Sequence, residues 1–179
     1  MRVWLGAVCC VAAMTGSLAK AAAPVDPQHA ALAALAGHWS VTQTLWSTPG
    51  APPAIDQGEA DFAMVLDGRH LRQELHIAAK DKPFEGLGYI GYDTSAKTYF
   101  STWMDVNFTG FIIAKGDYDA AARRYVFKGE VPNAAHPETP ISLREVMTVR
   151  DADHFTYDYY ETQNGKEAQA VKLDYTRAH

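Results

Sequence analysis

The chain has 179 residues, of which 47% are hydrophobic and 21% charged, and its formal charge is −5. These values predict one globular domain with a sizeable core and exclude a disordered or fibrous chain. The net negative charge argues against nucleic acid as a partner.

The first 21 residues have the pattern of a secretory signal peptide. Arg2 provides a short positive region, residues 3–14 are mostly apolar, and Ala19-Lys20-Ala21 offers a small-x-small cleavage site. The apolar run is shorter than the roughly 20 residues of a transmembrane helix, so we expect no stable membrane insertion. We expect cleavage after Ala21 or Ala23 and a periplasmic or secreted protein. The expected organisation is a signal peptide at 1–21, a linker at 22–28 and the folded domain at 29–179.

Both cysteines, Cys9 and Cys10, lie inside the predicted signal peptide. The mature chain is therefore predicted to have no disulfide, no thiolate nucleophile and no cysteine metal site. The seven histidines are not spaced as a metal-ligand cluster requires, so neither a metal nor a cofactor is predicted.

Residues 29–36 are predicted to form a short helix, because they are rich in alanine and place two leucines on one face. Asp26 and Pro27 provide an N-cap and a first-turn proline. After Gly37, β-branched and aromatic residues dominate and turn residues recur at roughly 8–12-residue spacing, which predicts an all-β fold. Ten strands are expected, at 38–47, 56–66, 69–79, 83–92, 97–105, 109–117, 123–131, 140–150, 153–162 and 168–177.

Most of the predicted turns are short, which makes neighbours in sequence antiparallel neighbours in space. The pattern Tyr92-Asp93-x-x-x-Lys97-x-Tyr99 returns as Tyr118-Asp119-x-x-x-Arg123-x-Tyr125. It predicts two hairpins in which Asp begins the turn and the tyrosines face each other; independent use of common turn chemistry is the alternative. Two longer segments, 47–55 and 132–140, hold three prolines each and are predicted to be loops at the rim of a barrel.

Glycines at 86, 88 and 91 match the G-x-G-x-x-G string of dinucleotide-binding proteins. That motif requires a helix directly after the glycines, whereas Tyr92-Asp93 and a turn follow here. The glycines are therefore interpreted as allowing sharp bending or close packing within a strand.

The two ends of the predicted barrel carry an aromatic residue and a cation. Trp39 opens the first strand and Arg177 lies near the end of the last. In an up-and-down barrel these strands are neighbours, so the guanidinium can lie over the indole and act as a structural clasp. An Arg beside a Trp can also form a ligand site, but the position at the two chain ends favours closure.

Five motifs, taken together, resemble those of the bacterial domain of unknown function 1579 family: Leu35-Ala36-Gly37-x-Trp39, Gly68-Arg69, Phe84-x-Gly86-x-Gly88-x-x-Gly91-Tyr92-Asp93, Thr102-Trp103-x-Asp105 and Tyr175-x-Arg177. The match spans nearly all of the mature chain. The resemblance implies a calycin-like barrel of the lipocalin or fatty-acid-binding-protein type, with Trp39 at the closed end beneath Arg177. It implies no catalytic residues.

A barrel of about ten strands can enclose one small molecule, so a small apolar or amphipathic ligand is the favoured partner. The residues expected to bind it are Trp103, Asp105, Phe111, Tyr157, Tyr159 and Arg72. Strand 97–105 has Trp103 and Asp105 on one face and Phe100 and Met104 on the other, and either face can be internal. In strand 69–79 a solvated outer position for Arg72 is favoured over a polar lumen.

Three other functions remain open. An enzyme would use Asp105, His76 or Glu145 for acid–base chemistry, although no nucleophile motif supports this class. The haem barrels called nitrobindins have a similar opening motif and use one axial His, for which His76 and His154 are the candidates. Their glycines after the Trp are replaced here by Ser40-Val41-Thr42, which disfavours haem. A structural role would use an aromatic outer surface to bind a partner.

Overall fold

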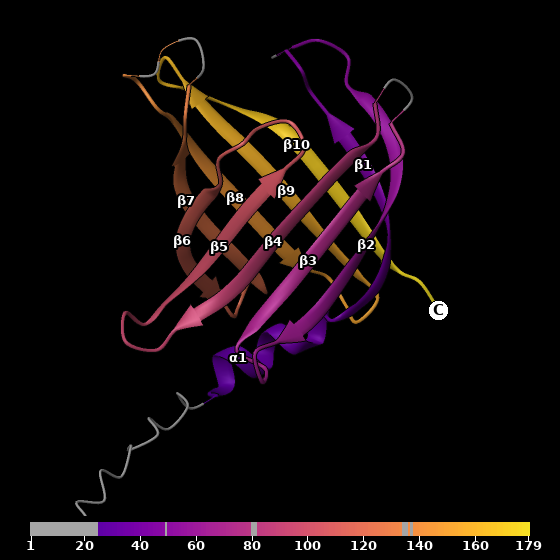
Figure 1. Cartoon of the computed structure of the whole chain (residues 1–179), viewed down its shortest axis with the longest axis vertical. Coiled ribbons are helices and arrows are strands. Elements are labelled where there is room, and N and C mark those ends of the chain that lie inside the picture. The colour runs from indigo at the N-terminus through magenta and orange to yellow at the C-terminus, as the bar shows by residue number, and fades with distance from the viewer. Residues whose placement is uncertain (1–24, 49, 80–81, 134–135, 137) are drawn as a thin grey trace, which may run out of the picture.

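Ten antiparallel strands form one closed barrel in the computed structural model, which describes residues 25–48, 50–79, 82–133, 136 and 138–179. Each strand pairs with the next in sequence, and β1 closes against β10 (Figure 1). The strands are β1 (Gly37–Leu45), β2 (Ala54–Val65), β3 (His70–Ile77), β4 (Phe84–Asp93), β5 (Thr98–Asp105), β6 (Ile112–Asp119), β7 (Arg124–Val131), β8 (Ile141–Val149), β9 (His154–Gln163) and β10 (Lys166–Arg177). The predicted up-and-down barrel is confirmed. The predicted signal peptide lies outside the described residues.

The turns follow the predicted chemistry. In the repeated hairpin, the Asp93 carboxylate accepts hydrogen bonds from the backbone N–H groups of Ser95 and Ala96, and the Asp119 carboxylate accepts one from Ala122. Tyr92 pairs with Tyr99 and Tyr118 with Tyr125, with ring centroids 4.8 and 4.4 Å apart. The two patterns therefore form two hairpins with the same Asp-initiated turn and the same pair of facing tyrosines, as predicted.

Most element ends differ by one to three residues from the predicted ones, and the starts of β6, β10 and the helix are among the larger differences. β6 begins at Ile112 instead of 109, because residues 106–111 form an irregular loop between β5 and β6. β10 begins at Lys166 instead of 168, because Asn164 and Gly165 both take positive φ and reverse the chain within two residues. The helix begins at Pro27, inside the segment predicted as linker.

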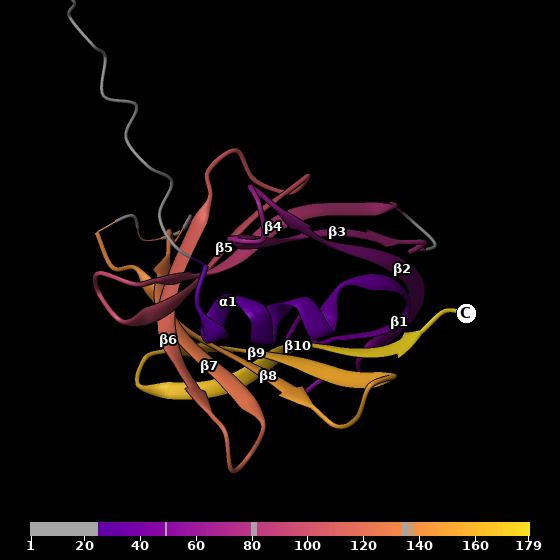
Figure 2. The ribbon, with the colours of Figure 1, turned by 90° about the horizontal axis from the view of Figure 1, so that it is seen from below.

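A short helical segment covers one end of the barrel. α1 (Pro27–Leu32) continues into the 3₁₀ turn η1 (Ala33–Leu35), and together they lie across the barrel end in Figure 2. Asp26 caps the helix, as predicted, by accepting hydrogen bonds from the backbone N–H groups of Gln28 and His29. Leu32 and Leu35 are fully buried, so the segment plugs the barrel with its apolar face.

Aromatic side chains fill the barrel directly above this plug. Phe155 contacts Trp39 edge-on at 4.7 Å between centroids and stacks on Tyr175 at 4.1 Å. Phe62 meets both Phe155 and Tyr175 edge-on. These rings are almost inaccessible to solvent, and their burial supplies much of the hydrophobic stabilisation of the domain. The barrel is therefore solid at the helix end.

Arg177, on the last strand, contacts both the first strand and the helical segment at this end of the barrel. Its guanidinium carbon lies 4.1 Å from the centroid of the Trp39 ring, and Trp39 and Arg177 are direct partners in the β1–β10 ladder. The guanidinium also donates to the carbonyl oxygens of Ala34, Ala36 and Ala152 at 2.9–3.0 Å. It therefore satisfies carbonyls at the end of the helical segment, which would otherwise lack partners.

We predict that Arg177→Ala lowers the free energy of unfolding by about 2 kcal/mol, because the cation–π contact and the hydrogen bonds to three carbonyls are lost together. Denaturant titration followed by circular dichroism measures this change. Arg177→Lys keeps the charge without the planar fork and is expected to recover part of the loss.

The matched control is Lys166→Ala, which removes an exposed cation from the opposite end of the same strand. We expect it to leave the free energy of unfolding within about 0.5 kcal/mol of the wild-type value. An equally small effect of Arg177→Ala would contradict the clasp.

Candidate functional site

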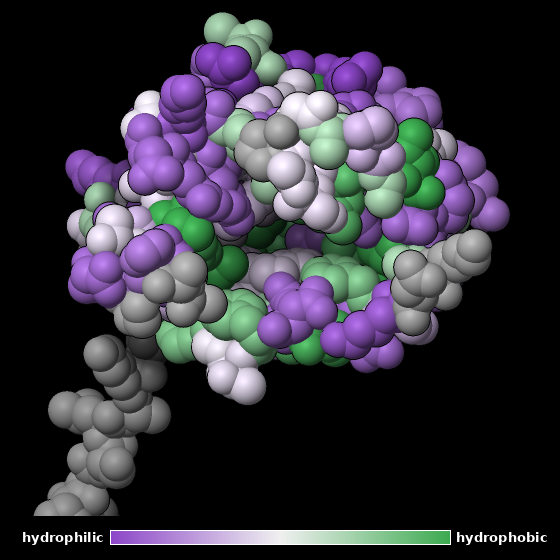
Figure 3. Space-filling model, turned by 90° about the horizontal axis from the view of Figure 1, so that it is seen from above, coloured by the Kyte–Doolittle hydropathy of each residue, from purple (hydrophilic) through white to green (hydrophobic). Residues whose placement is uncertain are grey.

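The half of the barrel away from α1 contains a cavity of about 290 Å³. Figure 3 looks into this end and shows a hollow whose walls are largely apolar. Seven strands contribute hydrophobic residues to its wall. These residues are Leu45, Leu75, Phe84, Ile90, Ile112, Leu173, Trp103, Tyr157 and Tyr159. A preformed apolar cavity of this volume is at the small end of the range for ligand pockets, about 300–1,000 Å³.

Two hydrogen bonds cross the barrel interior and form the floor of the cavity. Ser101 on β5 donates to the Glu145 carboxyl group on β8 at 2.7 Å, and Gln73 on β3 donates to the Tyr175 hydroxyl on β10 at 2.9 Å. Neither pair belongs to adjacent strands, so both bonds span the lumen. They separate the aromatic packing of the helix end from the hollow above it.

Trp103 is seated flat on two glycines of the neighbouring strand. A Cβ atom on Gly86 or Gly88 would lie 2.0 or 2.7 Å from ring atoms of Trp103, so no larger residue fits beneath the indole. The ring is further fixed by its Nε1, which donates to Asp105 at 3.1 Å, and by Phe84, whose ring lies nearly parallel to it. The glycine spacing that resembles a nucleotide motif therefore serves close packing, one of the two predicted interpretations.

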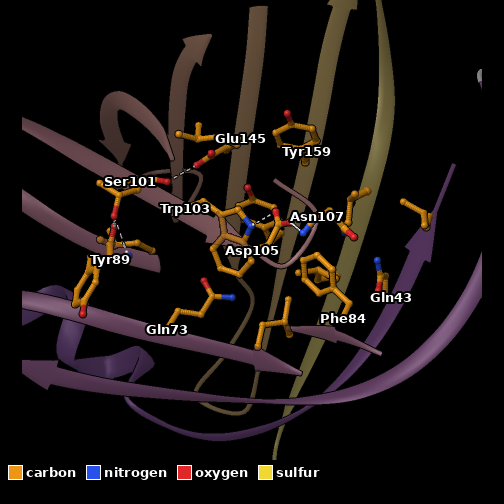
Figure 4. Close-up of a pocket in the computed structure, with 18 residues that line it drawn as sticks. Gln43, Gln73, Phe84, Tyr89, Ser101, Trp103, Asp105, Asn107, Glu145 and Tyr159 are labelled. Atoms are coloured by element: carbon orange, nitrogen blue, oxygen red, sulfur yellow. Dashed lines mark hydrogen bonds between the residues drawn. The ribbon is translucent and has the colours of Figure 1, made fainter. Parts of the chain in front are cut away.

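Glu145 is the most deeply buried ionisable group of the cavity, with 1% of its surface exposed. Burial raises its pKa from the ordinary 4.5 to about 7, although hydrogen bonds from Ser101 and Tyr157 oppose this shift. Near neutral pH both the protonated and the ionised form of this carboxyl group are thus accessible. It can accept a hydrogen bond, donate one or exchange a proton with a molecule in the cavity (Figure 4).

Four of the six predicted ligand-binding residues lie together at the cavity wall, namely Trp103, Asp105, Tyr157 and Tyr159. The other two lie elsewhere. Phe111 is in the loop before β6 and is 60% exposed, because β6 begins only at Ile112. Arg72 does not line the cavity and lies beside Glu74, with the two side chains 3.5 Å apart. Leu71, Gln73 and Leu75 on the same strand are buried, which leaves Arg72 on the outer face, the interpretation that the sequence favoured.

The polar cavity residues that were absent from the predicted ligand set include Gln43, Gln73 and Ser101. Glu145 was named only as an acid–base candidate. A signal for Glu145 exists, since Leu143 and Met147 flank it on one face of β8 and make it the single acid of a buried stripe. Gln43 and Gln73 likewise interrupt apolar stripes on β1 and β3.

Comparison with known proteins agrees with this architecture. The model of a family described as a protein of unknown function, DUF1579, matches residues 25–177. The chain belongs to this family. The match covers the helical plug and all ten strands, so the resemblance predicted from the five motifs is confirmed. Curated proteins provide no match.

The fold is similar to that in the crystal structure of Rv2717c from M. tuberculosis, with a TM-score of 0.62 and 18% identity over 87% of this chain and 100% of that chain. A redesigned β-barrel also matches, with a TM-score of 0.43 and 15% identity over 83% of this chain and 96% of the design. At this identity, the likeness to Rv2717c shows the fold alone.

Two further observations concern the described residues only. None of their helices is long and apolar enough to cross a membrane. They contain no group of three or more His, Cys, Asp or Glu side chains arranged to hold a metal ion.

Glu145 makes the stability of the barrel depend on pH. Because the pKa of Glu145 is raised on folding, the protonated group stabilises the folded state fully below pH 4.5, and this contribution is lost as the pH rises through 7. We predict that the free energy of unfolding of the wild type, relative to Glu145→Gln, falls by about 3 kcal/mol between pH 4.5 and pH 8. Denaturant titrations across this range measure the difference.

Glu85→Gln controls for the loss of one carboxylate, because Glu85 is exposed on β4. If the free energies of unfolding of the wild type and Glu145→Gln differ by the same amount at pH 4.5 and pH 8, the assignment of a raised pKa to Glu145 is wrong.

Proposed function

We propose that this protein binds a small apolar or amphipathic molecule inside the barrel. The observation that carries the proposal is the cavity of about 290 Å³, with walls that are mainly apolar and a polar floor at Glu145. A ligand's hydrocarbon part would gain about 0.8 kcal/mol for each CH₂ group transferred from water to such walls. The polar floor would orient its head group.

The construction of the wall supports a preformed site. The barrel is closed by hydrogen bonds between all neighbouring strands, and the Trp103 ring is held by two glycines and Asp105. Little conformational entropy would therefore be lost on binding, which favours affinity for a small ligand. The same rigidity favours selection by size.

Acid–base catalysis at Glu145 is a second candidate function. It is favoured by one specific observation: a buried carboxyl group with a pKa of about 7 that lines a cavity. The haem alternative receives no such support, because no histidine is among the described residues that line the cavity. A substrate screen in which Glu145→Gln turns over substrate as fast as the wild type would remove the catalytic candidate.

As part of the proposal, binding takes place in the periplasm or outside the cell. The support is the signal-peptide pattern of residues 1–21. We predict that the full-length chain, expressed in a bacterium, is recovered from the periplasmic fraction and begins at residue 22 or 24. Intact-mass measurement of the purified protein tests this, and an uncleaved N-terminus in the cytoplasmic fraction would contradict it.

We predict that N-phenyl-1-naphthylamine, a neutral apolar dye, binds in the cavity and gains fluorescence. Ile112→Trp should weaken binding at least about tenfold, because the larger side chain occupies the cavity. Ile113→Trp is the matched control, since the adjacent residue is 49% exposed and does not line the cavity.

Thermal unfolding checks that both variants fold. The proposed function is supported if the dye binds the wild type and Ile113→Trp but not Ile112→Trp. It is refuted if the wild type does not bind the dye, or if both variants bind it with wild-type affinity.

A further inference from the structure

We propose that the ligand of this cavity is an amphipathic amine, whose protonated nitrogen pairs with Glu145 at the floor while its hydrocarbon part lies against the apolar walls. This inference rests on the proposed binding function and names the chemical class of the ligand. Its basis is the sign of the charges around the cavity, the position of the carboxyl group and the polar groups without partners.

The ionisable side chains at the cavity wall are acidic or phenolic. Of the residues that the structure describes, two carboxyl groups, Glu145 and Asp105, line it, and no Lys, Arg or His does. A ligand carboxylate would therefore enter an apolar space that already holds two acids and whose described lining residues include no cation. An ammonium group would instead pair with a carboxylate in the cavity, which provides the opposite charge that a buried cation requires.

The two carboxyl groups have different surroundings. Asp105 accepts hydrogen bonds from the Trp103 indole at 3.1 Å and from the Asn107 backbone at 2.7 Å, so each of its oxygens already has a partner. Glu145 receives its bonds from the hydroxyl groups of Ser101 and Tyr157, and burial is the largest cause of its raised pKa. A ligand cation would therefore offset the desolvation cost of the ionised carboxylate more at Glu145 than at Asp105.

Further polar groups face the same space. Gln43 is buried to about nine-tenths, lines the cavity and makes no side-chain hydrogen bond within the described part of the chain. The amide can therefore bond to a molecule in the cavity. Gln73 uses its NH₂ group on Tyr175, which leaves its carbonyl oxygen available. Figure 4 shows both amides around the cavity, together with Glu145.

These groups match the donors of an ammonium head. An R–NH₃⁺ group has three N–H donors and no acceptor. The Glu145 carboxylate and the carbonyl oxygens of Gln43 and Gln73 are three acceptors on three different strands, β8, β1 and β3. A ligand alcohol can donate only one hydrogen bond, and a carboxylate none. The acceptors in the lining, with the carboxylate among them, thus favour the amine over both.

The test is a competition experiment with three probes of one chain length: nonylamine, nonan-1-ol and sodium nonanoate. Each displaces N-phenyl-1-naphthylamine from the wild type at pH 8. We expect nonylamine to displace the dye at a concentration at least about tenfold lower than nonanoate and below that of nonanol. Isothermal titration calorimetry with nonylamine checks that displacement reflects direct binding.

Glu145→Gln should weaken nonylamine binding at least about tenfold, since a charged hydrogen bond is replaced by a neutral one, and should weaken nonanol binding by a smaller factor. Glu85→Gln, the exposed control, should bind all three probes as the wild type does. Thermal unfolding shows whether each variant is folded, and the wild-type probe order tests the proposal even without the variant.

The outcomes separate the two proposals. If the dye binds but nonanoate competes as well as nonylamine, the cavity binds ligands and the amine inference is wrong. If nonanol and nonylamine compete equally and Glu145→Gln changes neither, the inference is also overturned. If neither the dye nor any probe binds the wild type, the proposed binding function itself fails.

Discussion

Pairing between β1 and β10 is the interaction on which the rest of this structure depends. It converts a ten-strand meander into a barrel with no free edge, so the backbone groups of every strand find partners within the sheet. Arg177 lies at one end of the β1–β10 ladder, over the Trp39 ring. It donates hydrogen bonds to three backbone carbonyls, two of which belong to the end of the helical plug. Closure and plugging are therefore coupled through one side chain.

Closure also creates the internal volume that the side chains must occupy. At the helix end, buried aromatic rings pack against one another, and at the other end a cavity remains above two hydrogen bonds that cross the lumen. The hollow end includes a feature that is costly for stability, a carboxyl group buried among apolar walls. Such costs are common at functional sites, because the surrounding fold provides the stability that the site lacks.

The fold was predictable because it depends on local signals. Turn residues such as Asp93 and Asn164 mark the reversals, the alternation of residue types marks the strands, and short connections make each strand pair with the next. The contact between Trp39 and Arg177 then follows from topology, since the first and last strands must be neighbours in a closed meander.

The site was less predictable because it depends on which face of each strand is internal. On β5 both faces carry aromatic residues, and the inward face is identified only by the burial of Tyr99 and Ser101 and by the position of Trp103 at the cavity wall. Phe111 was misplaced because the loop before β6 is longer than the turn signals indicated. The bond between Ser101 and Glu145 joins strands that do not pair, so no rule based on neighbouring residues could reveal it.

The division of the barrel into a filled half and a hollow half has a consequence for how the protein can diverge. The residues that hold the barrel closed, such as Trp39, Phe155 and Arg177, do not line the cavity. The residues that line it, such as Leu45 and Ile112, take no part in the clasp. Substitutions in the hollow half can therefore change what fits inside while the closure stays intact. Members of one family built in this way can share a scaffold and differ in the shape and polarity of the cavity.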